Sequence, residues 1–364
     1  MVTVLDTRAL NRATLARQLL LDRAELPVLD AVAHVGGLQA QEPQEPFIGL
    51  WSRLRAFDPS ALSELLTGRQ VVRTHLMRRT VHLLTAADTL AWRARHNAML
   101  RQRVTGVYRR ELAGVDLDEL AAAGRAAMAD GAHRSMPELA RAVLERWPSA
   151  DAKALGEMLV AGLLTMVQTP PRGLWRAKGG ARYALLSDWV GREIDPLDPD
   201  PADPVGQRLL RRYLAAFGPA ATADLRAWSG AAGLPAAVAA LRPELVSYRD
   251  ERGRELLDLP GAPLPDPETP APVRFLPAFD NAILGYQDRT RIIDDAHRNL
   301  SVAGARVVLV DGRVAATWTV QADTVVVTPL DRFTKADRTA VAEEAEELAL
   351  FLSDKESNRL RIES

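Results

Sequence analysis

Apolar and polar positions over the first 85 residues of this 364-residue chain follow first a helical and then a strand period. Helical spacing of apolar residues indicates four helices, at 14–21, 27–35, 47–57 and 59–66. Residues 71–77 and 80–84 then roughly alternate apolar and polar side chains, with Arg78-Arg79 as a tight connection between them. Several helices followed by a two-stranded ribbon are typical of a winged helix.

The same order of helices and a ribbon recurs twice further along the chain. In the second stretch, helices are expected at 118–129, 135–146 and 150–164, and a ribbon pairs 165–168 with 181–186. After a linker rich in Asp and Pro, the third stretch has expected helices at 205–217, 222–228 and 235–241 and strands at 245–248 and 255–259. Short β segments at 306–310, 313–319 and 324–328 and a helix at 335–352 follow.

These patterns predict an α+β fold that is mainly α-helical. Three tandem winged-helix units would be followed by a small β-sheet or partial barrel and a C-terminal helix. The expected boundaries are 1–100, 101–193 and 205–262 for the three units and 270–364 for the β-rich remainder. Nothing in the pattern indicates a dimerisation helix, so we expect a monomer.

Composition excludes several kinds of site. The chain has no cysteine, which rules out disulfides, thiolate zinc sites and thiol nucleophiles. Its six histidines are scattered, and no nucleotide-binding glycine loop or metal-binding spacing occurs, so we expect neither metal nor cofactor. Charged residues interrupt positions 1–20, and no run of about 18 apolar residues could cross a bilayer. We therefore expect a cytoplasmic protein.

The formal net charge of −1 conceals an uneven distribution. Residues 69–110 contain ten arginines and one acidic residue, Asp88, whereas residues 335–364 hold five Lys or Arg and eight Asp or Glu. The first segment is a candidate surface for binding phosphates. Because basic helices are also often merely solvated, charge alone leaves nucleic acid and solvent open as partners.

The two expected ribbons carry the candidate DNA contacts. On the first ribbon these are Arg73, His75, Arg78, Arg79, Thr80 and His82, and on the tip of the second they are Arg172, Trp175, Arg176 and Lys178. A two-residue turn at Arg78-Arg79 would place His75 and His82 opposite each other, toward a DNA groove. The histidines could instead be ordinary surface residues, and Trp175 could pack locally rather than stack beside a base.

Gln39-Ala40-Gln41 is the most informative segment for chemistry. Gly36-Gly37 weakens the preceding helix and Pro43 disfavours helical backbone before it, so the two amides should lie in an extended or turn segment. In such a segment, residues i and i+2 share a face, so both amides could hold one water. The alternative is that they only cap the preceding helix.

Four segments together resemble the winged-helix DNA glycosylases of the AlkZ/YcaQ type. They are Leu38-Gln39-Ala40-Gln41-Glu42-Pro43, Leu50-Trp51-Ser52-Arg53-Leu54, the ribbon from Arg73 to Leu83, and Leu276-Pro277-Ala278-Phe279-Asp280-Asn281. In that family Gln-x-Gln marks the AlkZ-like branch and Gln-x-Asp the YcaQ-like branch. Arg79 departs from the pattern, which has a glycine between the arginine and the threonine of the ribbon. The resemblance implies repair of N7-alkylated purines in duplex DNA, interstrand crosslinks included, and self-resistance to a DNA-alkylating natural product.

The residues also fit hydrolysis on chemical grounds. An N7-alkylated purine is cationic and leaves with little protonation, so the main task is to hold a water. The amide oxygens of Gln39 and Gln41 can accept hydrogen bonds from a water directed at C1′. Carboxylates could assist, although acids near turns more often cap helices; the candidates are Glu42, Asp280 and Asp294. Lysines are few and none lies beside the glutamines, so we expect no lyase chemistry through an imine.

Two other kinds of protein remain open at this point. A non-enzymatic winged-helix transcriptional regulator should tolerate replacement of Gln39 and Gln41 while it keeps its DNA affinity. A protein that only shields damaged DNA would bind a lesion but release no base. For an enzyme, a bulky or crosslinked purine could not enter a closed pocket, so we expect an open cleft with the two glutamines on one wall.

Overall fold

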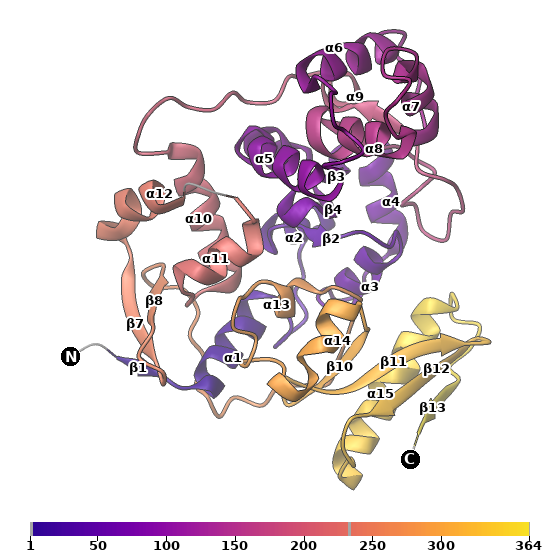
Figure 1. The fold of residues 1–364 in the computed structure, drawn as a ribbon. Helices are drawn as coiled ribbons and strands as arrows, with labels where there is room; N and C mark the ends of the chain where they lie inside the picture. The colour runs from indigo at the N-terminus through magenta and orange to yellow at the C-terminus, as the bar shows by residue number, and fades with distance from the viewer. Residues whose placement is uncertain (1–2, 232–233, 364) are drawn as a thin grey trace.

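The first sheet of the fold joins the two ribbons that carry the candidate site. The computed structural model describes residues 3–231 and 234–363. The sheet has the antiparallel order β2-β4-β3-β5-β6, with bounds β2 Leu38–Gln39, β3 Val71–His75, β4 Val81–Thr85, β5 Met166–Gln168 and β6 Tyr183–Leu185. Strand β3 pairs with β5 through Arg73 opposite Gln168 and Thr74 opposite Val167. The ribbons expected as two separate wings are therefore parts of one sheet (Figure 1).

Helices lie around this sheet and in the other parts of the chain (Figure 1). Their bounds are α1 Thr7–Arg17, α2 Val28–His34, α3 Glu45–Trp51, α4 Pro59–Thr67, α5 Ala86–Val107, α6 Leu117–Met128, α7 Met136–Leu144, α8 Ala152–Glu157, α9 Leu186–Val190, α10 Pro204–Phe217, α11 Thr222–Ser229, α12 Leu234–Leu241, α13 Asn281–Leu284, α14 Arg298–Ala303 and α15 Lys335–Leu352. A π-helical segment, Met158–Leu163, continues α8. The helix expected at 14–21 in fact begins and ends earlier, as α1. No helix within the described residues is long and apolar enough to cross a membrane.

Helix α5 spans 22 residues, and the pattern of apolar residues did not predict it. The side chain of Thr85 caps its first turn. Its buried face includes the polar residues Arg93 and His96. Arg93 donates to the carbonyl of Leu164, and His96 donates through Nδ1 to the carbonyl of Trp92, which makes their burial tolerable. Polar residues on the buried face hide the helical period of the apolar ones.

Two further sheets complete the fold. A three-stranded sheet contains β1 Val4–Leu5, β7 Val246–Asp250 and β8 Glu255–Asp258. A five-stranded sheet has the order β13-β12-β11-β10-β9, with bounds β9 Arg274–Leu276, β10 Val307–Val310, β11 Arg313–Gln321, β12 Thr324–Pro329 and β13 Leu360–Ile362. Helix α15 packs on this open sheet through Val341, Ala345 and Leu348. The expected sheet followed by a helix is thus present.

The N-terminal segment lies with the third stretch of the chain rather than with the first ribbon. Strand β1 runs parallel to β7. Arg17 of α1 forms a buried ion pair with Asp258 of β8, with Nη1 2.6 Å from Oδ1. The mainly α-helical α+β fold is confirmed. The number of winged-helix units and the domain boundaries stay predictions.

Candidate active site

Two glycines bring the chain out of α2 and into the strand that carries the first glutamine. Gly36 and Gly37 have φ values of 71° and 87°. A Cβ on Gly37 would lie 2.7 Å from Cδ2 of Leu84, so only glycine fits there. Asn281 donates from Nδ2 to the carbonyl of Gly37 at 3.0 Å. Backbone N–H groups, including that of Gly37, cap α2, so the alternative that the glutamines cap this helix is not what the structure shows.

Both glutamines lie outside a helix, Gln39 in strand β2 and Gln41 in the bend that follows, and their surroundings differ. Gln39 ends β2 opposite His82 of β4 and is only 8% exposed. Its Oε1 accepts a hydrogen bond from Nη2 of Arg78 at 2.8 Å. Gln41 is exposed, and its Oε1 accepts a long bond of 3.4 Å from the N–H of Val81. One amide is therefore held firmly inside the protein, and the other is open to solvent.

The register of the first ribbon differs from the expected one. Residues 76–80 connect the strands, with a 3₁₀ turn at Met77–Arg79, instead of a two-residue turn. His82 consequently pairs with Thr74, and His75 pairs with Val81. The prediction that the two histidines face each other is wrong, because a shift of one residue moves a side chain to the other face of a strand.

The tip of this ribbon packs into the protein instead of projecting as a wing. Leu76 and Met77 are buried in a cluster that includes Trp228. Arg78 donates from Nη1 to the carbonyl of Trp228 at 2.8 Å as well as to Gln39. We predicted Arg78 as a phosphate contact, and the structure instead fixes its guanidinium on two neutral oxygens.

The remaining residues of the tip are half-buried. Arg79 has a φ of 70°, in the left-handed region that favours glycine, which accounts for the glycine that the family pattern has here. Thr80 donates from Oγ1 to the carbonyl of Met77 at 3.2 Å. These two residues stay candidates for DNA contact.

Arg73 lies behind the glutamine segment. Its side chain is fully buried, and Nη2 donates to the carbonyl of Ala40 at 2.9 Å and to Oε1 of Gln168 at 3.1 Å. Burial, with a smaller effect from Arg172, lowers its pKa to about 10. Because no part of it reaches the surface, Arg73 supports Ala40 rather than gripping a phosphate as predicted.

Burial keeps the histidines near Gln39 neutral. It lowers the pKa of His82 well below 6.5, and the positive charge of Arg78 lowers it further. Nδ1 of His82 donates to the carbonyl of Thr80 at 3.0 Å, so His82 is held inside the sheet and does not face a DNA groove as predicted. The pKa values of His75 and His96 fall to about 4 for the same reason, burial. The surroundings of Gln39 therefore combine neutral histidines with a cation.

The second ribbon tip also packs against the protein. The ring centroid of Trp175 lies 5.0 Å from that of Phe47 and 5.1 Å from that of Phe351. Arg176 pairs with Asp354, just beyond the end of α15, and donates to the carbonyl of Leu352, the last residue of that helix. Trp175 and Arg176 are thus engaged with the C-terminal part rather than available to a base or a phosphate. Arg172 is half-buried on the carbonyl of Gly179, and Lys178 is exposed.

The candidate carboxylates have other tasks. Both oxygens of Asp280 bind Arg53, at 2.8 and 2.9 Å, and both side chains are fully buried. Asp294 pairs with Arg313. These two acids stabilise the fold and are not free to act on a water. Glu42 is exposed beside Gln41 and stays a candidate.

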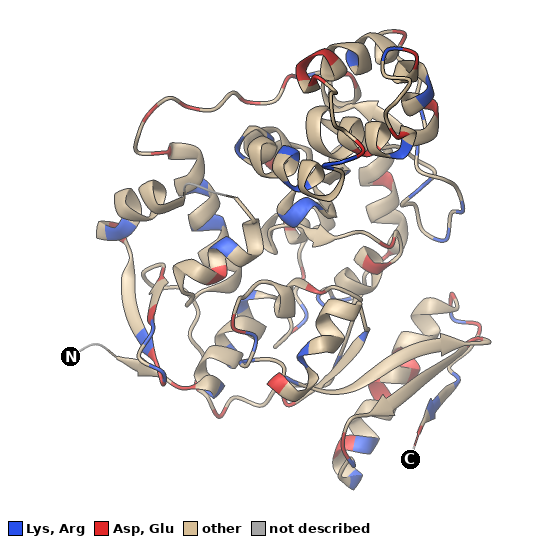
Figure 2. Cartoon of the chain, in the orientation of Figure 1, with Lys and Arg blue, Asp and Glu red and all other residues tan. Residues whose placement is uncertain are grey.

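The arginine-rich segment 69–110 does not form one surface. Two of its arginines are buried (Arg73, Arg93), two pair with acids (Arg95 with Asp203, Arg101 with Asp118) and one stacks on Trp189 (Arg69). Lysines and arginines are spread over many elements, with acidic residues among them (Figure 2). Arg103, Arg109 and Arg110 are exposed and remain candidates for phosphate contact.

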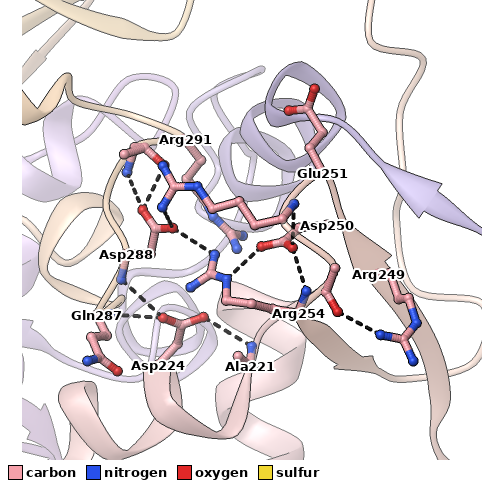
Figure 3. A network of polar contacts seen from close by, with 12 residues as sticks. Ala221, Asp224, Arg249, Asp250, Glu251, Arg254, Gln287, Asp288 and Arg291 are labelled. Carbon is pink, nitrogen blue, oxygen red and sulfur yellow. Dashed lines mark hydrogen bonds and ion pairs between the residues drawn. The ribbon is translucent and has the colours of Figure 1, made fainter.

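Sequence reasoning missed the part of the site that comes from α11. Gly230, at the end of this helix, has a φ of 68°, and a Cβ there would lie 3.1 Å from the backbone N of Arg78. At the other end, the buried carboxylate of Asp224 accepts bonds from the N–H groups of Ala221 and Gln287, at 3.0 and 2.9 Å (Figure 3). No local signal could reveal the contact of Gly230 with Arg78 or that of Asp224 with Gln287, because these partners lie far apart in the sequence.

The same network anchors the loop that follows α13. Asp288 accepts from Arg252 at 3.0 Å and from Arg254 at 2.7 Å, which ties the loop to the β7–β8 turn (Figure 3). Arg289 of this loop, together with Arg103, adds positive charge that helps burial to lower the pKa of Arg78 to about 10. Helix α11 and this loop therefore fix the ribbon tip and surround it with cations.

Comparisons with known proteins agree with this arrangement. The family described as DNA glycosylase AlkZ-like matches residues 32–351. An interstrand DNA cross-link repair glycosylase of Streptomyces sahachiroi is 25% identical over 366 residues, covering 92% of this chain and 93% of that protein. The solved structure of the Streptomyces sahachiroi DNA glycosylase AlkZ has the same fold, with a TM-score of 0.77, 22% identity and coverage of 99% of this chain and 100% of that one. Because the family model matches most of its length, the chain belongs to the AlkZ-like family of DNA glycosylases, which hydrolyse N-glycosyl bonds in DNA.

Proposed function

We propose that this glycosylase releases N7-alkylated purines from duplex DNA with a water held by Gln39 and Gln41. One observation carries the proposal: Gln39 ends the edge strand β2 of the first sheet, Gln41 follows it by two residues, and the amide of Gln41 is exposed. Ala40 between them still donates to the carbonyl of Val81, and side chains two residues apart in extended backbone share a face, so we infer that both amides reach the same water.

The reaction requires little acid–base chemistry from the protein. The water oxygen forms a bond to C1′ while the C1′–N9 bond breaks and its electron pair neutralises the cationic purine. The protein leaves an abasic site, and one proton of the water passes to solvent. The amide oxygen of Gln41 beside the sugar favours the positive charge that develops there, because it carries partial negative charge.

The surroundings of the glutamines support hydrolysis over other reactions. Asp280 is bound to Arg53, and the nearby histidines are neutral, so the two amides, with the exposed Glu42 beside them, are the groups left to hold a water. None of the lysines of the chain, at 153, 178, 335 and 355, belongs to this segment. The glutamine segment therefore supplies no lysine amine that could form an imine with the sugar.

The exposure of Gln41 supports a substrate that is too large for a closed pocket. A crosslinked purine cannot turn fully out of the duplex, so its C1′ must be reached from an open surface. The relative from Streptomyces sahachiroi is named for interstrand cross-link repair. We extend that substrate class to this chain, together with self-resistance to a DNA-alkylating natural product and action as a monomer.

The direct test measures free 7-methylguanine released from methylated duplex DNA by the wild type, Gln39→Ala and Gln41→Ala. Release should collapse in both variants while DNA binding is retained. A nitrogen-mustard crosslink in an oligonucleotide should be unhooked by the wild type alone. A wild type that releases neither 7-methylguanine nor a bulky N7 adduct would reject the proposal.

A further inference from the structure

The contact between Arg78 and Gln39 fixes which end of the amide faces the guanidinium. All five N–H groups of an arginine side chain are donors and it has no acceptor. The Gln39 atom that lies 2.8 Å from Nη2 must therefore be the oxygen, Oε1. Since the amide is planar, the NH₂ group of Gln39 is turned away from Arg78.

Arg78 is itself held from several sides. Its Nη1 donates to the carbonyl of Trp228 at 2.8 Å, so the two arms of the fork bind two different oxygens. Its backbone lies in the left-handed region, with φ 56°, against Gly230 at the end of α11. The neighbouring Met77 is fully buried. This arginine has little freedom to swing out toward a phosphate.

The partners of Arg78 leave its charge without a direct counterion. Both hydrogen bonds found for its guanidinium within residues 3–231 and 234–363 go to neutral oxygens, of Trp228 and Gln39. Arg53 pairs with the carboxylate of Asp280, whereas the buried Arg73 behind the segment also binds neutral oxygens. Burial and the charges of Arg289 and Arg103 make the location of Arg78 costly for a cation. What sets Arg78 apart is that one of its two partners is the side chain of Gln39.

The second glutamine has the opposite arrangement. Oε1 of Gln41 is exposed and only weakly engaged, by the N–H of Val81 at 3.4 Å. That oxygen can accept a stronger hydrogen bond from another donor, such as a water. The two amides of the segment therefore offer different groups: a donor from Gln39 and an acceptor from Gln41.

We propose that Arg78 is a positioning residue that assigns opposite roles to the two glutamines. It holds Oε1 of Gln39, so that Nε2–H of Gln39 donates to the oxygen of the attacking water and Oε1 of Gln41 accepts one of its protons. The remaining lone pair of the water is then free to attack C1′. This inference rests on the proposed function and deepens it, since it names the atoms that orient the water.

The first experiment is a double-mutant cycle on single-turnover release of 7-methylguanine, with Arg78→Ala, Gln39→Ala and the double variant. Arg78→Ala should slow release by roughly 10- to 100-fold, the loss that a misplaced group commonly causes. The double variant should be no slower than Gln39→Ala, because Arg78 acts through Gln39. Losses that multiply would overturn the proposal.

DNA affinity separates positioning from phosphate binding. The dissociation constant of Arg78→Ala and its salt dependence should match those of the wild type within about twofold, whereas loss of a phosphate contact lowers the salt slope by about 1. Weakened binding with an unchanged rate of release would overturn the proposal. The matched control is Arg211→Ala, which removes an arginine of α10 whose side chain is 40% exposed and pairs with Glu244. This variant should change neither the dissociation constant nor its salt dependence.

Two conservative variants test the roles of the Arg78 guanidinium and of Nε2 of Gln39. Arg78→Lys keeps the charge but cannot bind both oxygens in a fork, so release should be intermediate, and the variant also serves if Arg78→Ala fails to fold. Gln39→Glu keeps an acceptor for Arg78 but removes the donor, so release should fall as far as in Gln39→Ala. Full activity of Gln39→Glu would overturn the role of Nε2.

A wild type without any release would reject the proposed function and this inference together, whereas an active wild type with an equally fast Arg78→Ala would reject this inference alone.

Discussion

The two ribbon tips of the first sheet carry arginines that the sequence treats alike, yet Arg78 is half-buried, Arg176 is exposed, and their partners differ. Arg176 at the second tip pairs with the carboxylate of Asp354 beyond α15. Arg78 at the first tip binds the neutral oxygens of Gln39 and Trp228. A carboxylate partner neutralises the charge and explains the arginine as a link between parts of the fold. Neutral partners keep the charge, so its position beside the glutamines is informative about function.

The largest difference between the tips should come from replacing one glycine near each tip. Gly230→Ala places a Cβ 3.1 Å from the backbone N of Arg78 at a left-handed residue, so we expect a loss of about 1–2 kcal/mol of stability and clearly slower base release. Urea unfolding and single-turnover release measure the two effects. Gly180→Ala at the second tip, where an added Cβ meets nothing within 4 Å, is the control and should be close to neutral. If Gly230→Ala releases the base as fast as the wild type, the contact of α11 with the first tip has no role in base release.

Acid should weaken the first ribbon before the second. His75 and His82 lie on the first ribbon and His96 on α5 beneath it, all with pKa values lowered by burial, whereas residues 166–185 contain no histidine. Unfolded histidine binds a proton below pH about 6.5, but the folded groups do not, so stability is present above that pH and is lost as pH falls toward 4.

We expect a loss on the order of 1 to 2 kcal/mol for each such histidine between pH 7 and pH 5. Hydrogen exchange at the two pH values should show the amides of β3 and β4 losing protection first. His82→Gln should reduce the pH dependence of the urea midpoint, while replacement of the exposed His133 should not. Equal protection at both pH values would contradict the prediction.

Lys178 is the exposed cation of the second tip and should contribute modestly to DNA binding. Lys178→Ala should weaken binding by a few-fold, lower the salt slope by about 1 and leave single-turnover release unchanged, as expected for one phosphate contact. Binding titrations at several salt concentrations measure this slope. An unchanged slope would mean that the second tip does not meet DNA.

The smallest effect should come from Arg176→Ala. Its pair with Asp354 is largely exposed, with side-chain exposures of 45% and 56%, so its loss should cost less than about 1 kcal/mol and leave base release unchanged. Thermal unfolding and the release assay check both points. Slower release by Arg176→Ala would show that the two tips are more alike than their partners indicate.

Much of the fold could be predicted because it depends on local patterns. Most helices and strands lie within a few residues of their expected positions, and Gly36-Gly37 and Pro43 correctly placed Gln39 outside a helix. Helix α5 was missed because Arg93 and His96 occupy its buried face. The sequence could not predict that protein groups instead of DNA contact the side chains of Arg73, His82, Trp175 and Arg176. A charged or aromatic residue at a predicted tip says nothing about what packs against that tip.

The sequence by itself determined the order of most of the elements, the non-helical segment at Gln39 and Gln41 and the family to which the chain belongs. Each of these follows from residues that are close together in the chain or from short matching segments. Only the tertiary structure decided the ribbon register, the union of two ribbons in one sheet and the partners of Arg78. Those features depend on contacts between residues that are distant in the sequence. Arg78 and Trp228, for example, are 150 residues apart, so no local pattern could predict their contact.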